Sequence, residues 1–378
     1  MERHDQWFNF MSRARVVMIG AFPPPVGGAA FVNAAVEAEL TVAGVEVTRV
    51  NLAGPSLAHN RGVTYHARRL MANAHGLLRA RATADRQKTL YIVPDAGLGA
   101  WYTRAHMTAA ARRYGAVVIH HHSCRYVEEH DRAIAAVARI ARGTATHVFL
   151  TEGMAEAFQR QYGDVSFRVA TNASFVRQEA ECQPLSRGAG PLRIGHLSNL
   201  CADKGFFAVA DAFEAVRAAG IDATLVLAGP ILEQAVADRL TNLVASHGNS
   251  VRHAGPLAGD DKLKFYREID VFLFPTEFKQ EAAPLVVYEA LAAGVPVVAT
   301  DRGLIAEIVR EDVGGAVCER NADFTAFVTN YLRNQTWSEP EHNRRAIAIK
   351  EWLRDECARS AAQHEALVAQ LAASPAAR

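Results

Sequence analysis

The sequence contains few cysteines. Five cysteines are scattered over 378 residues, and no two of them form a C-x-x-C pair; they are Cys124, Cys182, Cys201, Cys318 and Cys357. This pattern argues against a disulfide framework and fits a reduced, cytoplasmic setting best.

Long apolar runs and an excess of one charge are also missing. No uninterrupted apolar run reaches the length of a membrane span, and the charged N-terminus lacks the apolar core of a signal peptide. The net charge is only +1, which argues against wholesale nucleic-acid binding and leaves a local basic patch open. The dinucleotide fingerprint G-x-G-x-x-G is absent.

The chain is long enough for two domains, and half of its residues are hydrophobic, so each domain can build a core. Short apolar runs alternate with helical patterns, which predicts an α/β fold. A polar segment rich in Gly and Pro predicts a linker. We expect a first domain over residues 1–180, a linker over 181–192, a second domain over 193–350 and a C-terminal helix over 351–378.

The most informative stretch runs from residue 270 to residue 300. Its pattern predicts a buried strand, a polar loop, a helix that Pro284 can open, and a second strand. Glu281 ends the loop and Glu289 lies in the helix. By itself this is one crossover of any α/β protein. However, a helix N-terminus at the carboxyl end of a parallel strand suits phosphate, and carboxylates beside it accept hydrogen bonds from hydroxyls. Phosphate and hydroxyls together describe a sugar nucleotide.

Glu281 and Glu289 match the E-x7-E signature of the retaining glycosyltransferases of family 4, and the flanking residues 275–276 and 289–300 resemble that family as well. The resemblance implies a GT-B fold, in which two Rossmann-like doubly wound domains face each other across a cleft and a C-terminal helix crosses back to the first domain. It also implies transfer of a sugar from a nucleotide donor with retention and without a metal or other cofactor.

The family resemblance assigns roles to several residues of the second domain. Glu281 would hold donor-sugar hydroxyls near the reacting carbon, with a nucleophile as its alternative role, and Glu289 would bind the ribose. Lys204 and the backbone at Ala283 and Leu285 would bind the diphosphate. Two departures are visible: Ala282-Ala283-Pro284 replaces the common Gly-Phe-Gly, and an uncharged residue stands where the family has Arg. That residue is Asn199 or, in another alignment, His196.

Three features of the first half complete the expected site. Gly27 and Gly28 follow the first strand and resemble the family loop that approaches the donor, although a plain tight turn is the simpler interpretation. Three histidines follow the strand at 115–119. His122 best matches a family histidine that reaches the donor sugar, and His120 is second. A metal site is not expected, because neighbours in an extended chain point to opposite faces.

Residues 59–88 form a basic region with seven Lys or Arg residues and one acid, Asp85. Two interpretations stay open: a solvated helix face, or a surface for an anionic acceptor or membrane leaflet.

Taken together, these features predict a hexosyltransferase of bacterial surface-polysaccharide or glycolipid assembly. Its acceptor would be a glycan or a lipid-linked sugar, and its location would be cytoplasmic or peripheral to the inner membrane face. The alternatives are a GT-B sugar-nucleotide epimerase, and a glycosyltransferase-like protein that binds nucleotide sugars without turnover.

Overall fold

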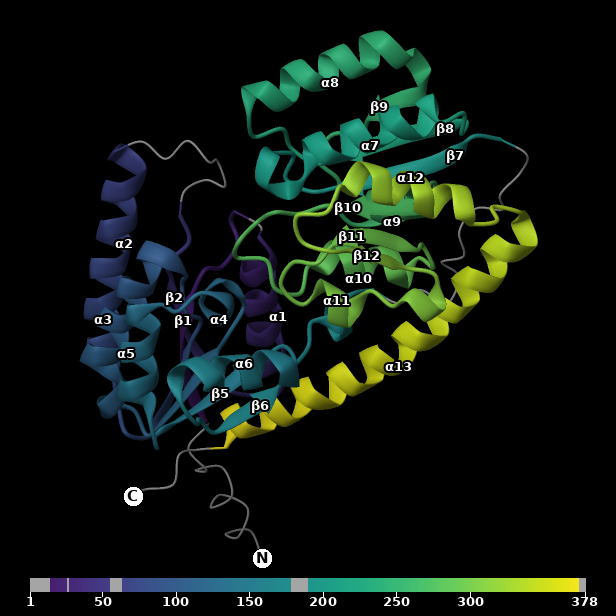
Figure 1. Ribbon diagram of the computed structural model, residues 1–378. Coiled ribbons are helices and arrows are strands. Elements are labelled where there is room, and N and C mark those ends of the chain that lie inside the picture. Colours follow the sequence, from purple (N-terminus) through teal and green to yellow (C-terminus); the bar gives the residue numbers. More distant parts are fainter. Residues whose placement is uncertain (1–13, 26, 55–62, 178–189, 374–378) are drawn as a thin grey trace, which may run out of the picture. The chain divides into compact units, whose positions relative to one another are not determined.

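The computed structural model describes residues 14–25, 27–54, 63–177 and 190–373. The chain forms two compact units, one made of Met1–Ala170 with Ala362–Arg378 and the other of Thr171–Ala361 (Figure 1). The predicted linker over 181–192 lies outside the described residues as far as residue 189. The domain boundaries expected from the sequence therefore stay a prediction.

The first unit contains a six-stranded sheet in the order β2-β1-β3-β4-β5-β6, in which every neighbouring pair is parallel. Its strands are β1 (Arg15–Gly20), β2 (Glu46–Asn51), β3 (Lys88–Ile92), β4 (Ala116–His120), β5 (Ala145–Phe149) and β6 (Phe167–Val169). The inner strands β1, β3 and β4 read as nearly continuous apolar runs, as in parallel sheets that are covered on both faces, whereas the edge strands β2 and β6 are largely exposed. The strand order reverses between β1 and β3, which is the switch point of a doubly wound sheet.

The helices of the first unit are α1 (Gly28–Val42), α2 (Val63–Ala82), α3 (Ala100–Ala110), α4 (Arg125–Glu128), α5 (Arg132–Ala141) and α6 (Glu152–Tyr162). Helix α3 packs against both α2 and α5. The apolar spacing predicts a helix over residues 128–141; its end at Ala141 is confirmed, and its start is wrong, because α5 begins at Arg132. Asp131 accepts hydrogen bonds from the N–H groups of Ala133 and Ile134 and so starts a separate helix there.

The second unit contains another parallel six-stranded sheet, in the order β12-β11-β10-β7-β8-β9. Its strands are β7 (Leu192–Leu197), β8 (Ala223–Ala228), β9 (Val251–His253), β10 (Val271–Phe274), β11 (Val297–Thr300) and β12 (Ala316–Cys318). This is the order of a dinucleotide-binding sheet, and its switch point lies between β7 and β10. The three-residue strand β12 is too short to stand out in the sequence, and we did not predict it.

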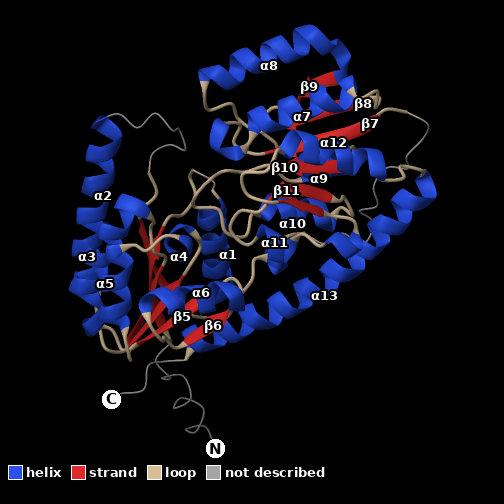
Figure 2. Ribbon diagram, in the orientation of Figure 1, coloured by secondary structure: helices blue, strands red, loops and turns tan. Residues whose placement is uncertain are grey.

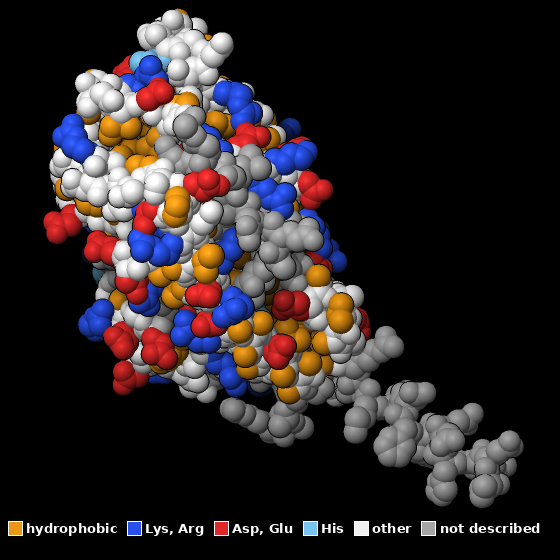
Figure 3. Space-filling view, turned by 90° about the vertical axis from the view of Figure 1, so that its right-hand side faces the viewer, with side chains coloured by type: hydrophobic (Ala, Val, Ile, Leu, Met, Phe, Trp, Pro, Cys, Tyr) orange, Lys and Arg blue, Asp and Glu red, His pale blue; other side chains and the backbone are white. Residues whose placement is uncertain are grey.

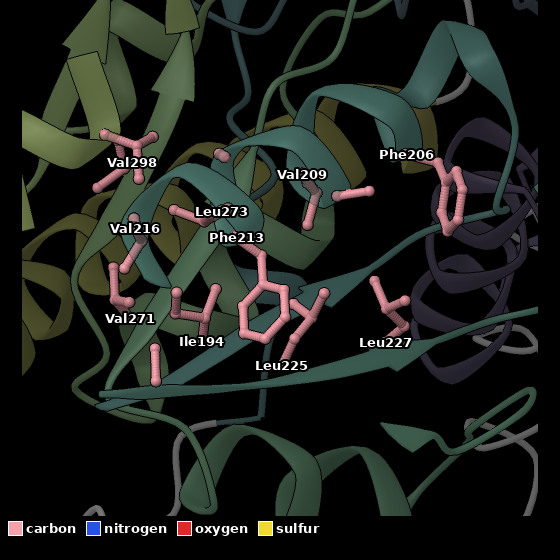
Figure 4. Close-up of a cluster of buried hydrophobic side chains, with 14 of the residues drawn as sticks. Ile194, Phe206, Val209, Phe213, Val216, Leu225, Leu227, Val271, Leu273 and Val298 are labelled. Atoms are coloured by element: carbon pink, nitrogen blue, oxygen red, sulfur yellow. The ribbon is translucent and has the colours of Figure 1, made fainter. Parts of the chain in front are cut away.

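The helices of the second unit are α7 (Phe206–Ala218), α8 (Gln234–His247), α9 (Asp260–Arg267), α10 (Leu285–Ala292), α11 (Ile305–Ile308) and α12 (Phe324–Asn334). Helix α7 packs against α8 and α12. Side chains of α7 such as Phe206 and Phe213 cover Ile194, Leu225 and neighbours on the strands (Figure 4). This apolar layer fixes the end of β7 and the start of α7, where the candidate site begins.

The long helix α13 (Glu339–Ala372) starts in the second unit, and its last turns belong to the first. Figure 2 shows it as one continuous helix. Within the first unit, Gln370 bonds to Arg168 (2.6 Å) and to Thr146 (3.0 Å). The predicted helix that returns to the first domain is therefore present.

The surface carries both signs of charge in similar amounts. On the face drawn in Figure 3, Lys and Arg side chains lie among Asp and Glu side chains, in keeping with the net charge of +1. No helix within the described ranges is both long and apolar enough to cross a membrane.

Candidate functional site

The candidate site of the second unit forms where the loops after β7 and β10 meet. These two strands are parallel neighbours, so their carboxyl ends lie at the same edge of the sheet (Figure 1). The loop after β7 ends in the short helix η5 (Ala202–Lys204), and the loop after β10 leads to α10. A doubly wound sheet binds its ligands in the crevice at this switch point.

Gly205 allows the two loops to touch. Its φ of +82° lies in the left-handed region, and a Cβ there would stand 2.1 Å from the carbonyl oxygen of Pro275. The backbone of Glu277 also donates to the carbonyl of Asp203 at 2.8 Å. Only glycine fits both the conformation and the space, so the Lys204-Gly205 pair is held directly against the loop after β10.

This contact brings together two of the predicted site residues. The Nζ of Lys204 lies 2.5 Å from Oε2 of Glu281, and Thr276 Oγ1 donates to the same oxygen at 3.2 Å. Both charged side chains are largely buried. The ring of Phe278 lies 4.3 Å from the Lys204 ammonium, so an aromatic face also contacts the cation. The result is an ion pair at the switch point with limited access to water.

Glu289 has a second set of partners. Its Oε1 lies 2.5 Å from the Nζ of Lys262, and its Oε2 accepts a hydrogen bond from the buried Tyr266 hydroxyl at 3.0 Å. Lys262 and Tyr266 are four residues apart on α9, so they project from one face of that helix. Burial and the charge of Glu289 hold the pKa of Tyr266 well above its ordinary value, so Tyr266 stays a donor. The carboxylate is thus held in one orientation.

The start of α10 lies beside these carboxylates. Pro284 has an extended backbone and occupies the N-cap position, one residue before the helix, so the expectation that Pro284 forms the first helical turn is wrong by one residue. Leu285 is the first helical residue, and Ala283 is buried just before the cap. The N–H groups of a first helical turn have no acceptor within the helix and attract anions.

The two candidates for the missing arginine differ sharply. His196 is fully buried in β7, where Nδ1 lies 2.9 Å from the Leu273 carbonyl and Nε2 lies 2.8 Å from the Ser198 hydroxyl. Both ring nitrogens are therefore engaged, and burial lowers the pKa of His196 to about 4. Asn199 is half-buried in the loop after β7. Asn199 is thus the candidate with a side chain left for a ligand.

Gly27 and Gly28 lie at the start of α1 in the first unit. Gly27 is the N-cap, with an extended backbone (φ −126°). Gly28 has no neighbour within 4 Å of an added Cβ. Neither positive φ nor crowding therefore requires glycine at position 28, and glycine inside a helix costs about 0.5–1 kcal/mol relative to alanine. The space is open on the side where a Cβ would project.

The three histidines at the end of β4 point to opposite sides, as expected for neighbours in an extended chain. His121 bonds to Tyr126 and to His147 and stacks on Phe149, so it belongs to the core. The rings of His120 and His122 lie together, with centroids 4.0 Å apart. Their Nε2 atoms are buried and have no partner among the described residues.

The neighbours of these two rings set their charge. Nδ1 of His120 lies 2.6 Å from the Tyr91 hydroxyl. Burial, with the charges of His122 and His364, lowers the pKa of His120 well below its ordinary value. Burial and His364 lower the pKa of His122 to about 3. Both rings are therefore neutral at pH 7. The Nε2 atom of each ring is therefore available for a hydrogen bond to a bound ligand.

Sequence reasoning missed Lys262, Tyr266 and Thr276, whose side chains touch the two carboxylates. The first two lie in a helix that the sequence places correctly at residues 260–267, but no motif marks them. Within the described ranges, no group of three or more His, Cys, Asp or Glu side chains is arranged to hold a metal ion. The expectation that no metal or cofactor is needed stays a prediction.

Comparison with protein families matches residues 178–352 to the family described as "Glycosyl transferases group 1". The match contains the whole switch-point site. Among curated proteins, the sulfoquinovosyl transferase SQD2 of Arabidopsis thaliana is 44% identical over 61 residues. This stretch is 16% of the present chain and 12% of that protein, so the chain matches only a small part of the relative's length.

Solved structures resemble the chain over most of its length. The Anabaena protein Alr3699/HepE, in complex with UDP, is 17% identical and has a TM-score of 0.58, with 91% of this chain and all of that chain covered. The same protein has been solved with UDP-glucose. WaaG, a glycosyltransferase involved in lipopolysaccharide biosynthesis, is 14% identical, with a TM-score of 0.64 and coverage of 94% and 99%.

These likenesses confirm the GT-B fold that the sequence resemblance implies. The family match covers the second sheet and its loops. Residues 178–352 therefore resemble a group 1 glycosyltransferase domain, and the chain has the GT-B fold.

Proposed function

We propose that this chain is a retaining, metal-independent glycosyltransferase that moves a sugar from a nucleotide-sugar donor to a glycan or lipid-linked acceptor. One observation carries the proposal: Lys204 and Glu281 meet at 2.5 Å at the switch point of the matched domain, beside the N-terminus of α10. A cation, a carboxylate and a helix N-terminus in one place suit a diphosphate with sugar hydroxyls attached.

The donor is proposed to be a uridine nucleotide sugar. Support comes from the Anabaena neighbour, which has been solved with UDP and with UDP-glucose. In the present chain, Lys204 and the N–H groups at Leu285 and Ala283 would bind the diphosphate, with Asn199 as a neutral donor. Glu289, oriented by Lys262 and Tyr266, would accept hydrogen bonds from the ribose hydroxyls.

The reaction needs charge stabilisation on the leaving diphosphate. Lys204 would supply it as a preformed cation at the switch point. Loss of one preorganised donor of this kind raises the activation free energy by roughly 2.7–4 kcal/mol. Glu281 would hold hydroxyls of the donor sugar near the reacting carbon, beside Lys204. His122, with His120 second, and the Gly27-Gly28 start of α1 would contribute from the first unit.

The acceptor is proposed to belong to bacterial surface-polysaccharide or glycolipid assembly, in line with the role of the structural neighbour WaaG. Helix α2 would contact an anionic membrane. Val63, Leu70, Met71 and Leu78 on α2 are exposed apolar side chains. Arg68, Arg79 and Arg81 lie on the same helix, which carries no acidic residue. An apolar stripe flanked by basic residues favours an anionic membrane surface.

The proposal is tested first by thermal shift of the full chain with UDP, GDP and ADP in parallel. A ligand at 100 times its Kd stabilises the folded state by about 2.7 kcal/mol. We expect UDP to give the largest rise in Tm. Absence of a rise with all three nucleotides would contradict a functional donor site.

Turnover separates the remaining alternatives. Incubation with UDP-glucose and an acceptor glycan should give a product whose anomeric proton coupling matches that of the donor, as retention requires. Conversion of the donor sugar to its epimer without acceptor would indicate an epimerase instead. Tight nucleotide-sugar binding without any product from a panel of donors and acceptors would indicate a binding protein.

A further inference from the structure

Asn172 lies at the point where the chain passes into the second unit. The two compact units change over between Ala170 and Thr171. Asn172 then precedes the short helix η4 (Ala173–Phe175), and its side chain is 5% exposed. Its Nδ2 donates a hydrogen bond to the carbonyl oxygen of Ala283 at 3.0 Å. A side chain at the boundary of the two units thus bonds to a backbone carbonyl 111 positions further along the chain, just before α10 begins.

The acceptor of this bond has a special place in the loop. Ala283 C=O belongs to the peptide plane that it shares with the nitrogen of Pro284. Pro284 has no N–H, so the Ala283 carbonyl is the one hydrogen-bonding group of that peptide. The next residue, Leu285, begins α10. A hydrogen bond that holds this carbonyl therefore also holds the Ala283–Pro284 peptide plane, which directly precedes the first residue of α10.

The neighbouring carbonyls of the same loop are also held. The N–H of Leu304 donates to the Ala282 carbonyl at 3.0 Å, and the N–H of Glu281 donates to Phe278 at 2.9 Å. Gly303 passes so close that an added Cβ would lie 2.4 Å from the Glu281 carbonyl. Asn172 completes this set at the end of the loop nearest to α10. The backbone around Glu281 is thereby held from several sides.

Asn172 is itself anchored by α13. The Ser360 hydroxyl donates to the Thr171 carbonyl (2.8 Å) and accepts from the Ser174 N–H (3.0 Å). The Cys357 thiol donates to the Ala173 carbonyl (3.0 Å). Asn172 is flanked on both sides by these bonds. Its side chain is therefore presented to Ala283 from a fixed backbone.

Stability alone does not explain an asparagine here. Its Oδ1 is buried and has no partner among the described residues. A buried unpaired acceptor costs about 1–3 kcal/mol, whereas a typical hydrogen bond contributes only about 0.5–1.5 kcal/mol. The cost of the unpaired Oδ1 thus offsets much of what the bond to the Ala283 carbonyl contributes. What it does supply is the direction of the Ala283 carbonyl.

We propose that Asn172 is a positioning residue: it sets the Glu281 loop and the start of α10, through the Ala283 carbonyl, in the geometry that binds a nucleoside diphosphate. This rests on the proposed function of the donor site. The chain changes from one unit to the other twice, at residues 170–171 and within α13. Asn172 lies where these two segments are bonded to each other.

The test compares Asn172→Ala with a matched control, Asn73→Ala, in the full chain. Asn73 on α2 is also 5% exposed and also donates its Nδ2 to a backbone carbonyl, that of Arg69, at 2.8 Å. We expect Asn172→Ala to raise the Kd for UDP about tenfold in calorimetry, and to speed hydrogen exchange at the Glu281 and Leu304 amides. Asn73→Ala should change neither the Kd for UDP nor these exchange rates, even if it lowers the Tm as much as Asn172→Ala does.

A double variant identifies the route of the effect. If Asn172 acts through the Glu281 loop, Asn172→Ala should lower kcat/KM clearly in the wild-type background and little in Glu281→Gln. The proposal would be overturned if Asn172→Ala lowered kcat/KM by the same factor in both backgrounds. It would also be overturned if a folded Asn172→Ala variant kept the wild-type Kd for UDP and the wild-type hydrogen-exchange rates.

The two proposals fail separately. If the wild-type chain binds neither UDP, GDP nor ADP, the proposed function fails. In that case hydrogen exchange at the Glu281 and Leu304 amides tests the positioning role by itself. Faster exchange in Asn172→Ala would show that Asn172 holds the loop in place, and unchanged exchange would refute the positioning role.

Discussion

Lys204 and Glu281 are 77 positions apart in the chain, and their side-chain atoms Nζ and Oε2 lie 2.5 Å apart. The two loops can approach because Gly205 leaves room for the Pro275 carbonyl. In this structure the ammonium and the carboxylate neutralise each other. A diphosphate would compete with Glu281 for Lys204, since it carries more negative charge.

Removing one member of this pair should cost stability as well as activity. Lys204→Met leaves the largely buried carboxylate of Glu281 unpaired, and breaking a buried ion pair costs about 3–5 kcal/mol as an upper range. We expect the Lys204→Met, Glu281→Gln double variant to recover most of the Tm, because no uncompensated charge remains. Turnover should stay at least about 100-fold below wild type in both. Recovery of turnover along with Tm would contradict a role in leaving-group stabilisation.

Glu289 should matter for binding more than for the chemical step. Glu289→Gln removes the charge that accepts from ribose hydroxyls, and we expect about a tenfold higher Kd for UDP, equivalent to ~1.4 kcal/mol. Tyr266→Phe, which removes one hydrogen bond to Glu289, should shift the Kd in the same direction by less. Glu214→Gln is the control, because Glu214 pairs with Arg239 at 2.7 Å elsewhere in the same domain. Equal effects of the Glu289 and Glu214 variants on UDP binding would count against the assignment.

The same substitution at two glycines should have opposite effects on stability. Gly205→Ala places a Cβ against the Pro275 carbonyl at positive φ, so we expect a fall in Tm and loss of UDP binding. Gly28→Ala enters open space at the start of α1, so its Tm should hold or rise by an amount equivalent to about 0.5–1 kcal/mol. Turnover of Gly28→Ala should nevertheless fall if the donor approaches this helix start. Wild-type turnover would refute that role.

Buried histidines should make the protein sensitive to mild acid. Burial lowers the pKa of His106, of His147 and of His196 to about 4, from an ordinary 6.5. Between pH 6.5 and 4 the unfolded chain takes up protons that the folded chain does not. The free energy of unfolding should therefore be fully present above pH 6.5 and fall with pH through this window, by ~1.4 kcal/mol per pH unit for each such histidine.

Urea unfolding at pH 7.5 and pH 5.5 measures this loss. Both ring nitrogens of His106 are buried without a partner among the described residues, so His106→Leu should reduce the difference between the two pH values. The exposed His75 provides the control, His75→Gln. A difference unchanged by His106→Leu would contradict the assignment.

Membrane contact by α2 is tested by sedimentation with vesicles that contain phosphatidylglycerol. Leu70→Ser should weaken binding, and Arg79→Glu should weaken it further at low salt, at about 1 kcal/mol per basic residue near the surface. Ile347→Ser is the matched control, because Leu70 and Ile347 are both 56% exposed and Ile347 lies on α13. Wild-type binding by the Leu70 and Arg79 variants would leave α2 as a solvated helix face.

Much of the fold followed from local patterns. Apolar runs predict strands over residues 15–20, 223–228 and 251–253, and helical spacing predicts a helix over 260–267. These are the observed bounds of β1, β8, β9 and α9, because periodicity and strand length are local properties. The resemblance around Glu281 and Glu289 indicated the GT-B fold correctly, and the match to the group 1 glycosyltransferases agrees with it, while the assignment to family 4 stays a prediction. The split between α4 and α5 was missed, because it depends on the capping bond of a single residue, Asp131.

The site itself was decided by tertiary structure. The sequence alone named Lys204, Glu281 and Glu289, but it could not say that Lys204 touches Glu281 or that Lys262 touches Glu289, because parallel strand order brings distant loops to one edge. Burial likewise separated His196 from Asn199. Asn172 carries no local signal at all, since its role exists only where two passages of the chain and the loop before α10 meet. Local propensity thus determined the elements, and packing between distant elements determined which side chains share a site.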